Sequence, residues 1–178
     1  MKSYLLLKTF IGVCLMAITY SCIEPPEYDN PPHIDFQNVE VYSSLENRVK
    51  KDSLILVTSF EDGDGDLGLD NEDLETPPFN LPNTNNGLNY FVDILIKKNG
   101  AFQTLTLPSG FTFNGRFFRL APDGRIGPIE GDLRYSIVIR NNNPLVKEGD
   151  VLKFRVWIRD RALNQSNIVE SDEVTIFK

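Results

Sequence analysis

Apolar and polar residues alternate with a period of two along most of the chain after residue 33. The runs 90–96, 133–140 and 152–159 place apolar side chains at every second position, which is typical of strands with one buried face. The run 53–60 (SLILVTSF) is apolar on both faces, as expected for a central strand. Shorter runs predict further strands at 33–42, 101–107, 111–113, 116–120 and 174–176.

Turn-forming residues separate these runs. Asn99-Gly100 lies between two of them, and because both residues tolerate a positive φ the pair predicts a tight hairpin. No window longer than ten residues carries a helical stripe. Seven to nine strands within residues 33–178 therefore predict an all-β domain, an antiparallel β-sandwich of the immunoglobulin or fibronectin type III style. Residues 62–89 interrupt the pattern as one long insert rich in Asp, Asn, Gly and Pro, and loops of that length are usually functional or disordered.

Residues 1–21 have the anatomy of a secretory signal peptide. Lys2 and Lys8 give a positive region, and the nine apolar residues 10–18 that follow are too few to span a bilayer. Thr19-Tyr20-Ser21-Cys22 then resembles a bacterial lipobox. The resemblance implies cleavage before Cys22 and a lipid anchor, with palmitate, on that residue. The alternative is an ordinary signal peptide that leaves Cys22 as a free thiol.

Residues 22–32 predict a tether between this anchor and the β-domain. The stretch IEPPEYDNPP holds four prolines and three acids, a composition that favours an extended, semi-rigid spacer. Acids close to the lipidated Cys loosely resemble the surface-export tag of Bacteroidota lipoproteins. We therefore expect an outer-membrane lipoprotein of the cell envelope, either exposed at the surface or facing the periplasm.

Composition narrows the function classes. The chain has 178 residues, with 18 Lys and Arg against 25 Asp and Glu, and a formal net charge of −7. Nucleic-acid binding requires a basic footprint, so the charge argues against that class of partner. His33 is the single histidine, and neither a Gly-x-Ser-x-Gly motif nor a Walker loop is present. The sequence therefore predicts a protein that is not an enzyme.

The sharpest chemical feature is FEDGDGDLGLDNED at residues 60–73. Its first three aspartates after Glu61 alternate with glycine, and such crowded carboxylates repel one another unless a cation lies between them. Ca²⁺ takes six to eight oxygen ligands, and glycines let the backbone curl around one point. An EF-hand-like count predicts as ligands Asp62, Asp64, Asp66, the Gly68 carbonyl, Asp70 and Asp73. Since Leu67 stands where that loop has Gly, the segment resembles a free-standing DxDxD calcium loop; the alternative is a metal-free, solvated acidic turn.

A second polar segment, WIRDRALNQSN at residues 157–167, resembles the D-R-A-G-N-x-S turn of bacterial immunoglobulin-like modules, with Leu163 in place of the Gly. In such a sandwich, the run 53–60 is the B-like strand and the run 151–159 is the F-like strand. The loops after these strands emerge at the same end. Asp160 is then a further predicted metal ligand. In the alternative, Asp160 and Asn164 only cap their own turn.

The lipobox, the strand followed by DGDGDLG and the C-terminal IRDRALNQSN together resemble a family of small Bacteroidota lipoproteins, which has no assigned activity. We therefore expect a non-catalytic, membrane-anchored module whose calcium loop stabilises a surface for an unidentified protein or glycan partner. The alternative is a carbohydrate-binding accessory lipoprotein of a glycan-uptake system. Trp157 bears on this choice, because it lies on the polar face of its strand and is either covered by another strand or open to a ligand.

Overall fold

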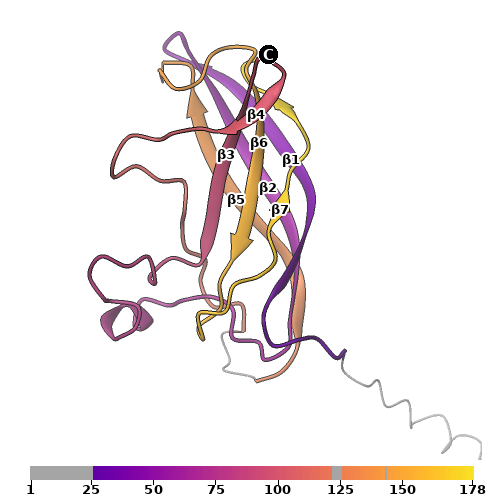
Figure 1. The fold of residues 1–178 in the computed structure, drawn as a ribbon, viewed down its shortest axis with the longest axis vertical. Coiled ribbons are helices and arrows are strands. Elements are labelled where there is room, and N and C mark those ends of the chain that lie inside the picture. Colours follow the sequence, from indigo (N-terminus) through magenta and orange to yellow (C-terminus); the bar gives the residue numbers. More distant parts are fainter. Residues whose placement is uncertain (1–25, 122–125, 143) are drawn as a thin grey trace, which may run out of the picture.

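The computed structural model describes residues 26–121, 126–142 and 144–178, so the predicted signal peptide and Cys22 lie outside the described residues. Two antiparallel sheets face each other (Figure 1), which confirms the predicted all-β sandwich. Within the described ranges, no helix has the length and apolar character needed to cross a membrane. The elements are β1 (His33–Glu46), β2 (Val49–Asp62), the short 3₁₀ helix η1 (Asp73–Glu75), β3 (Tyr90–Lys98), β4 (Ala101–Thr104), β5 (Ile129–Arg140), β6 (Val151–Ile158), β7 (Val169–Glu170) and β8 (Val174–Thr175).

The first sheet has the order β1-β2-β5. β1 and β2 form a long hairpin, and Asn47 and Arg48 make its turn with positive φ angles. β1 extends four residues past its predicted end because the exposed residues Ser43 to Glu46 still pair with β2. β2 lies between its two neighbours and is buried or half-buried at nearly every position, as its apolar sequence predicts.

The second sheet has the order β4-β3-β6-β7, and β8 also pairs with β6. Asn99 and Gly100, both with positive φ, turn the chain from β3 into β4 and confirm the predicted hairpin. Trp157 of β6 is half-buried and lies nearly parallel to its cross-strand partner Phe91, with ring centroids 5.4 Å apart. One face of the Trp157 ring is therefore taken by a neighbouring strand.

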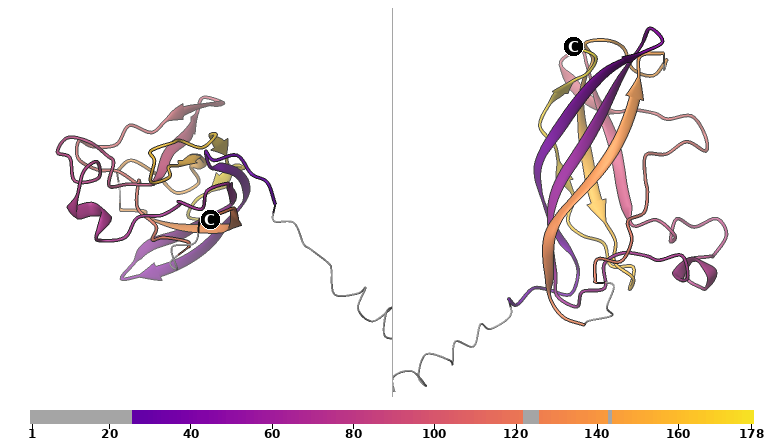
Figure 2. Two further views of the ribbon diagram at one scale, coloured as in Figure 1. Left: turned by 90° about the horizontal axis from the view of Figure 1, so that it is seen from below. Right: turned by 180° about the vertical axis from the view of Figure 1, so that it is seen from behind.

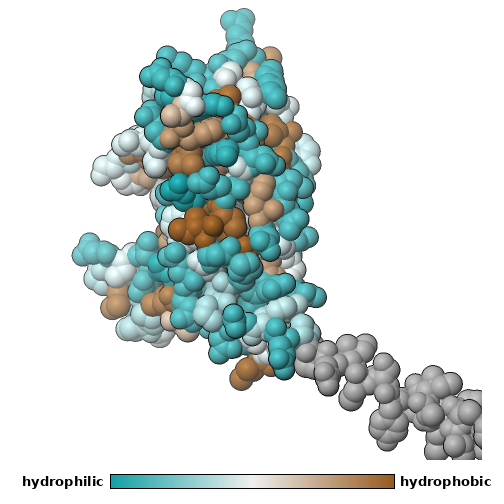
Figure 3. Space-filling model, turned by 45° about the vertical axis from the view of Figure 1, so that its right-hand side comes forward, coloured by the Kyte–Doolittle hydropathy of each residue, from teal (hydrophilic) through white to brown (hydrophobic). Residues whose placement is uncertain are grey.

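The core fills the space between the two sheets. Leu54 and Leu56 of β2 and Phe154 of β6 are fully buried, and Tyr90 of β3 stacks on Tyr135 of β5 with ring centroids 4.2 Å apart. Burial of one large apolar side chain contributes about 1.5–3 kcal/mol. Burial of the apolar side chains between the two sheets therefore holds the sheets together. The outer surface is largely hydrophilic on the face shown in Figure 3, with separate hydrophobic patches between polar residues.

Two predicted strands do not form. Residues 111–113 and 116–120 lie outside any strand, and β4 ends at Thr104 rather than at residue 107. The segment forms one isolated bridge with β3, between Gly115 and Tyr90, and Asn114 Oδ1 accepts the Val92 N–H of the same strand. It then crosses to the insert. There the Leu69 N–H donates to the Phe117 carbonyl. Phe113 and Phe117 pack against the core, whereas Phe111 and Phe118 are exposed, so the apolar pattern of this segment reflects partial burial and not pairing in a sheet.

Candidate metal centre

The insert after β2 and the turn after β6 lie at the same end of the sandwich (Figures 1 and 2). Leu67 of the insert forms an isolated antiparallel bridge with Asp160 of the turn. This is the arrangement expected if β2 is the B-like strand and β6 the F-like strand. The end that carries both loops is the candidate functional end of the domain.

Three carboxylates converge there. Asp62, Asp64 and Asp66 each offer an oxygen, and these oxygens lie within 4.8 Å of one another. Asp62, the last residue of β2, is fully buried, and neither of its carboxylate oxygens has a hydrogen-bond partner among the described residues. One buried oxygen of Asp66, Oδ1, also lacks a partner there. Because an unpaired buried carboxylate is costly, the cluster offers acceptors that the surrounding protein does not satisfy.

The charges in this cluster destabilise one another. Burial, and then the charges of Asp64, Asp66 and Asp160, raise the pKa of Asp62 to about 7, although the nearby backbone N–H of Asp66 opposes this shift. Burial and the charge of Asp160 also raise the pKa of Asp66, although Arg161 opposes this shift. A bound divalent cation reverses these effects, because it becomes the largest local charge and favours the ionised carboxylates.

Asp160 is buried, and it both caps its own turn and lies beside the acidic cluster. Its Oδ1 accepts the backbone N–H of Asn164 at 2.7 Å, and its Oδ2 accepts the Asn164 side-chain amide at 2.8 Å. Asp160 thus caps its own turn, in agreement with one of the two interpretations of its sequence. Its charge also reaches Asp62, which places it beside the cluster. Leu163 in this turn has a φ of 68°, the left-handed conformation that Gly adopts most readily.

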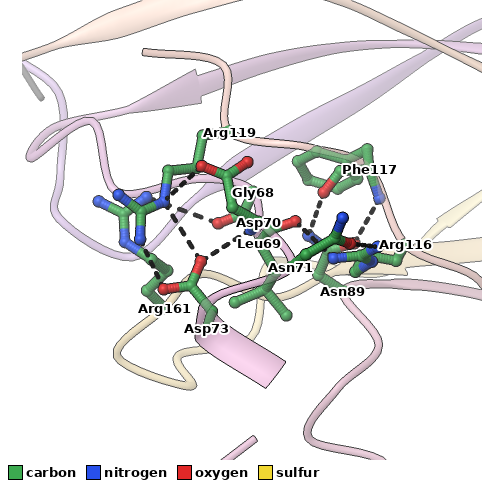
Figure 4. Close-up of polar contacts among 10 residues, drawn as sticks. All are labelled: Gly68, Leu69, Asp70, Asn71, Asp73, Asn89, Arg116, Phe117, Arg119 and Arg161. Atoms are coloured by element: carbon green, nitrogen blue, oxygen red, sulfur yellow. Dashed lines mark hydrogen bonds and ion pairs between the residues drawn. The ribbon is translucent and has the colours of Figure 1, made fainter. Parts of the chain in front are cut away.

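Asp70 and Asp73 lie in a different environment from the first three aspartates. Arg119 Nη2 donates to Asp73 Oδ1 at 2.5 Å, and Arg119 Nε lies 3.3 Å from an Asp70 oxygen (Figure 4). Burial alone raises the pKa of Asp73, but the hydrogen bonds from Arg119 and from the Asp70 N–H outweigh it and hold the pKa below its usual value. The third predicted ligand of this half, the Gly68 carbonyl, accepts a long hydrogen bond of 3.5 Å from Arg161. The structure therefore brings Asp62, Asp64 and Asp66 together. The other predicted ligands of this loop, Gly68, Asp70 and Asp73, contact arginines instead.

Residues 111–120, which cross from β3 to the insert, contribute groups that the sequence pattern did not reveal. Arg116 donates to the Leu69 carbonyl at 3.1 Å and to the Asn71 side chain at 2.8 Å. Asn89, which is buried, exchanges two hydrogen bonds with the backbone of Phe117 (Figure 4). These contacts fix the insert against the sandwich. No local spacing identifies them, because each joins residues that are far apart in the sequence.

The glycines of DGDGDLG have a role beyond chain curvature. A Cβ atom at Gly63 would lie 2.3 Å from the Tyr28 carbonyl oxygen, and one at Gly65 would lie 2.4 Å from the Gly127 carbonyl oxygen. At Gly68 it would lie 2.3 Å from the Phe118 carbonyl oxygen. Three separate segments therefore pack directly on the backbone of the acidic loop, and glycine is required at each contact.

The donor set favours one kind of ligand. Three convergent carboxylates offer only oxygen, the ligand type that suits Ca²⁺, Mg²⁺ and Mn²⁺, whereas the described histidine, His33, is not part of the group. Comparisons of the chain with protein-family models, with curated proteins and with solved structures found no match.

Proposed function

We propose that this protein is a calcium-stabilised β-sandwich that serves as a non-catalytic binding or interaction module. The single observation that carries the proposal is Asp62, which is fully buried and has neither carboxylate oxygen paired among the described residues. Such a group is tolerated only when a proton or a cation neutralises it. Because Asp64 and Asp66 converge on the same point, one divalent ion neutralises all three carboxylates together.

Calcium is favoured over its competitors by geometry. Mg²⁺ demands a near-ideal octahedron and gives up its water reluctantly, whereas Ca²⁺ accepts six to eight oxygens in flexible arrangements. Three aspartates on alternate positions of one loop supply carboxylate oxygens that lie within 4.8 Å of one another. Backbone carbonyls and water complete the shell of Ca²⁺ in such loops.

The ion would act on stability and on the shape of one end of the domain. It binds the folded loop and not the unfolded chain, so it stabilises the fold by mass action. It would also hold the insert in a fixed position beside the turn of Asp160, since Leu67 and Asp66 already contact that turn. A rigid loop end of this kind suits recognition of a protein or glycan partner.

Calcium titration of the dialysed chain from residue 23, followed calorimetrically, tests the metal site. We expect one ion per chain, with Asp64→Asn weakening or abolishing the binding. Asp132→Asn is the matched control, because this exposed aspartate lies on β5 outside the cluster. Binding that is absent, or that is equally strong in Asp64→Asn, would remove the proposal.

We also propose that the protein is a lipid-anchored component of the outer membrane, of the small Bacteroidota type. The support is the lipobox-like sequence ending at Cys22, followed by the Pro-rich tether. In the native host, Cys22→Ala should abolish acylation and move the protein out of the detergent phase. If the variant still enters the detergent phase with an unchanged acylated mass, the anchor lies elsewhere.

A glycan-binding accessory role is the second candidate. It is favoured by Trp157, whose half-buried ring lies on the outer side of the second sheet. Phe91 occupies one face of that ring, which leaves at most the other face for a sugar. Since Trp157 is the single tryptophan of the chain, quenching of tryptophan fluorescence by oligosaccharides reports directly on this surface. Unchanged fluorescence across a panel of oligosaccharides would leave only the first candidate.

A further inference from the structure

The last residues of the tether lie directly on the acidic loop. The Gly63 N–H, between Asp62 and Asp64, donates to the Asp29 carbonyl at 2.9 Å. The Tyr28 carbonyl is so close that a Cβ at Gly63 would lie 2.3 Å from its oxygen. The tether and the candidate metal loop are therefore in contact through backbone atoms.

Other contacts hold the same stretch against the sandwich. The Tyr28 hydroxyl donates to Glu130 Oε2 at 2.5 Å, and Pro32 is buried. Just after this stretch, at the start of β1, Asn167 Oδ1 accepts the Ile34 N–H and the Asn167 side-chain amide donates to the Ile34 carbonyl. We call residues 26–32 the strap, because they run across the loop end before β1 begins (Figures 1 and 2).

The strap does not pair with any described strand. A hollow of about 510 Å³ lies along it, lined in part by Glu27, Pro31, Glu61 and Gln165. Neither Tyr28 nor Asp29 lies in a strand. The hydrogen bond from Gly63 is thus one of few links between strap and loop, and it depends on the position of the loop backbone.

We propose that the ion in the acidic loop decides whether the strap is fastened, and so sets the orientation of the domain on its tether. This inference rests on the proposed calcium site. With the ion bound, Asp62 and Asp64 converge and hold the Gly63 N–H toward Asp29. Without it, Asp64 and Asp66 repel each other and the buried Asp62 has no ion to bind, so the loop relaxes and the strap is released. Coupling of this kind is reciprocal, so the fastened strap must also tighten calcium binding.

Chymotrypsin cleavage after Tyr28 measures the state of the strap. The protein is the unlipidated chain from residue 23, which contains every described residue, and the readout is release of the peptide IEPPEY (residues 23–28). Cleavage of a locally open segment follows the population of the open form when reclosing is fast. We expect saturating Ca²⁺ to slow the release by about fivefold or more, the lower range of typical allosteric coupling.

Two variants and one control distinguish the contacts of the strap from the metal site itself. Gly63→Ala adds a methyl group against the Tyr28 and Asp29 carbonyls and keeps all three aspartates, so the strap should be open with and without calcium, and calcium should bind more weakly by the factor that reciprocal coupling sets. Gly87→Ala is the matched control in the same insert, where the nearest atoms lie at 3.2 Å and 3.3 Å, and it should behave as the parent protein. Tyr28→Phe keeps the cleavage site, loses the Glu130 bond and should be cleaved faster in both conditions.

Calorimetric titration of the same samples makes the outcomes distinct. Removal of residues 23–30 should weaken calcium binding by the factor by which calcium slows cleavage. If calcium binds and the cleavage rate does not change, the strap proposal is wrong and the metal site stands. If calcium does not bind at all, both proposals fall.

Discussion

The Asp66 carboxylate accepts the backbone N–H of Ala162 at 3.1 Å. This hydrogen bond joins the acidic loop to the turn that carries Asp160, across 96 positions of sequence. It leaves the other oxygen of Asp66 buried and free of described partners. One oxygen of Asp66 thus fixes the acidic loop against the turn after β6, and the other oxygen is available to a cation.

Asp160→Asn tests whether the turn contributes to the metal site. The amide keeps the shape of the side chain but removes a negative charge that acts on Asp62. Calcium affinity should fall by about tenfold or more, the range found when a residue that supports metal ligands is removed. Without calcium the variant should lose little stability, because relief of repulsion offsets the weaker cap on Asn164. An unchanged calcium affinity would show that Asp160 serves only its own turn.

Arg119→Gln tests whether Asp70 and Asp73 belong to the metal site or to the arginine pair. Asp73 is only 13% exposed in this pair, so the loss should lie between that of an exposed pair, below about 1 kcal/mol, and that of a buried one, about 3–5 kcal/mol. Denaturant unfolding measures it, with the more exposed pair of Arg134 and Glu40 as control through Arg134→Gln. Calcium affinity should not fall in either variant. A large loss of affinity in Arg119→Gln alone would bring Asp70 and Asp73 back as ligands.

Gly68→Ala tests the close packing around the loop. Gly68 and Gly100 both have positive φ, at +96° and +83°, but a methyl group added at Gly68 would meet backbone atoms within 4 Å, the closest being the Phe118 carbonyl oxygen, whereas one added at Gly100 would meet open space. Gly100→Ala should therefore cost only the backbone term of about 1–2 kcal/mol. Gly68→Ala should cost at least about 1–3 kcal/mol more, since overpacking adds to it. Equal free energies of unfolding for the two variants would contradict this close packing.

The sandwich was predictable because its strands carry the signal in their own sequence. Apolar residues alternate in β6 because one face of that strand is buried, and the run 53–60 of β2 is apolar on both faces because both are buried or half-buried. Asn99-Gly100 forms its hairpin through local backbone preference. The strands predicted at 111–113 and 116–120 did not form, because Phe113 and Phe117 are partly buried against the core without pairing in a sheet, while Phe111 and Phe118 are exposed.

The candidate site was predictable only in part. The spacing of Asp62, Asp64 and Asp66 indicated convergence, because alternate residues of one loop are local neighbours. The same count failed to anticipate that Asp73 pairs with Arg119, since that contact joins segments 46 positions apart. Likewise, the glycines indicated curvature, but the packing of Tyr28 on Gly63 depends on tertiary structure.

The raised pKa of Asp62 predicts a specific dependence on pH. Without metal, folded Asp62 keeps its proton up to about pH 7, whereas the unfolded chain releases it near the usual value of 3.8. The folded state therefore binds more protons across this window, and its stability falls as the pH rises from about 4 to about 7. Urea unfolding in chelator measures the free energy of unfolding at each pH. The parent protein should lose stability across this window relative to Asp62→Asn. Parallel pH profiles for the two proteins would mean that Asp62 is not buried as a neutral acid.

Thermal unfolding in calcium and in chelator is the most direct test of the metal site. At a hundredfold excess over the dissociation constant, Ca²⁺ should add about 2.7 kcal/mol of stability, which corresponds to a rise in Tm on the order of 5–10 °C. Mg²⁺ should do less, and Asp64→Ala combined with Asp66→Ala should abolish the rise. The account predicts a reversible, calcium-dependent Tm in the parent protein and none in the double variant. Identical Tm values for the parent protein in millimolar Ca²⁺ and in chelator would contradict it and leave the segment as a solvated acidic turn.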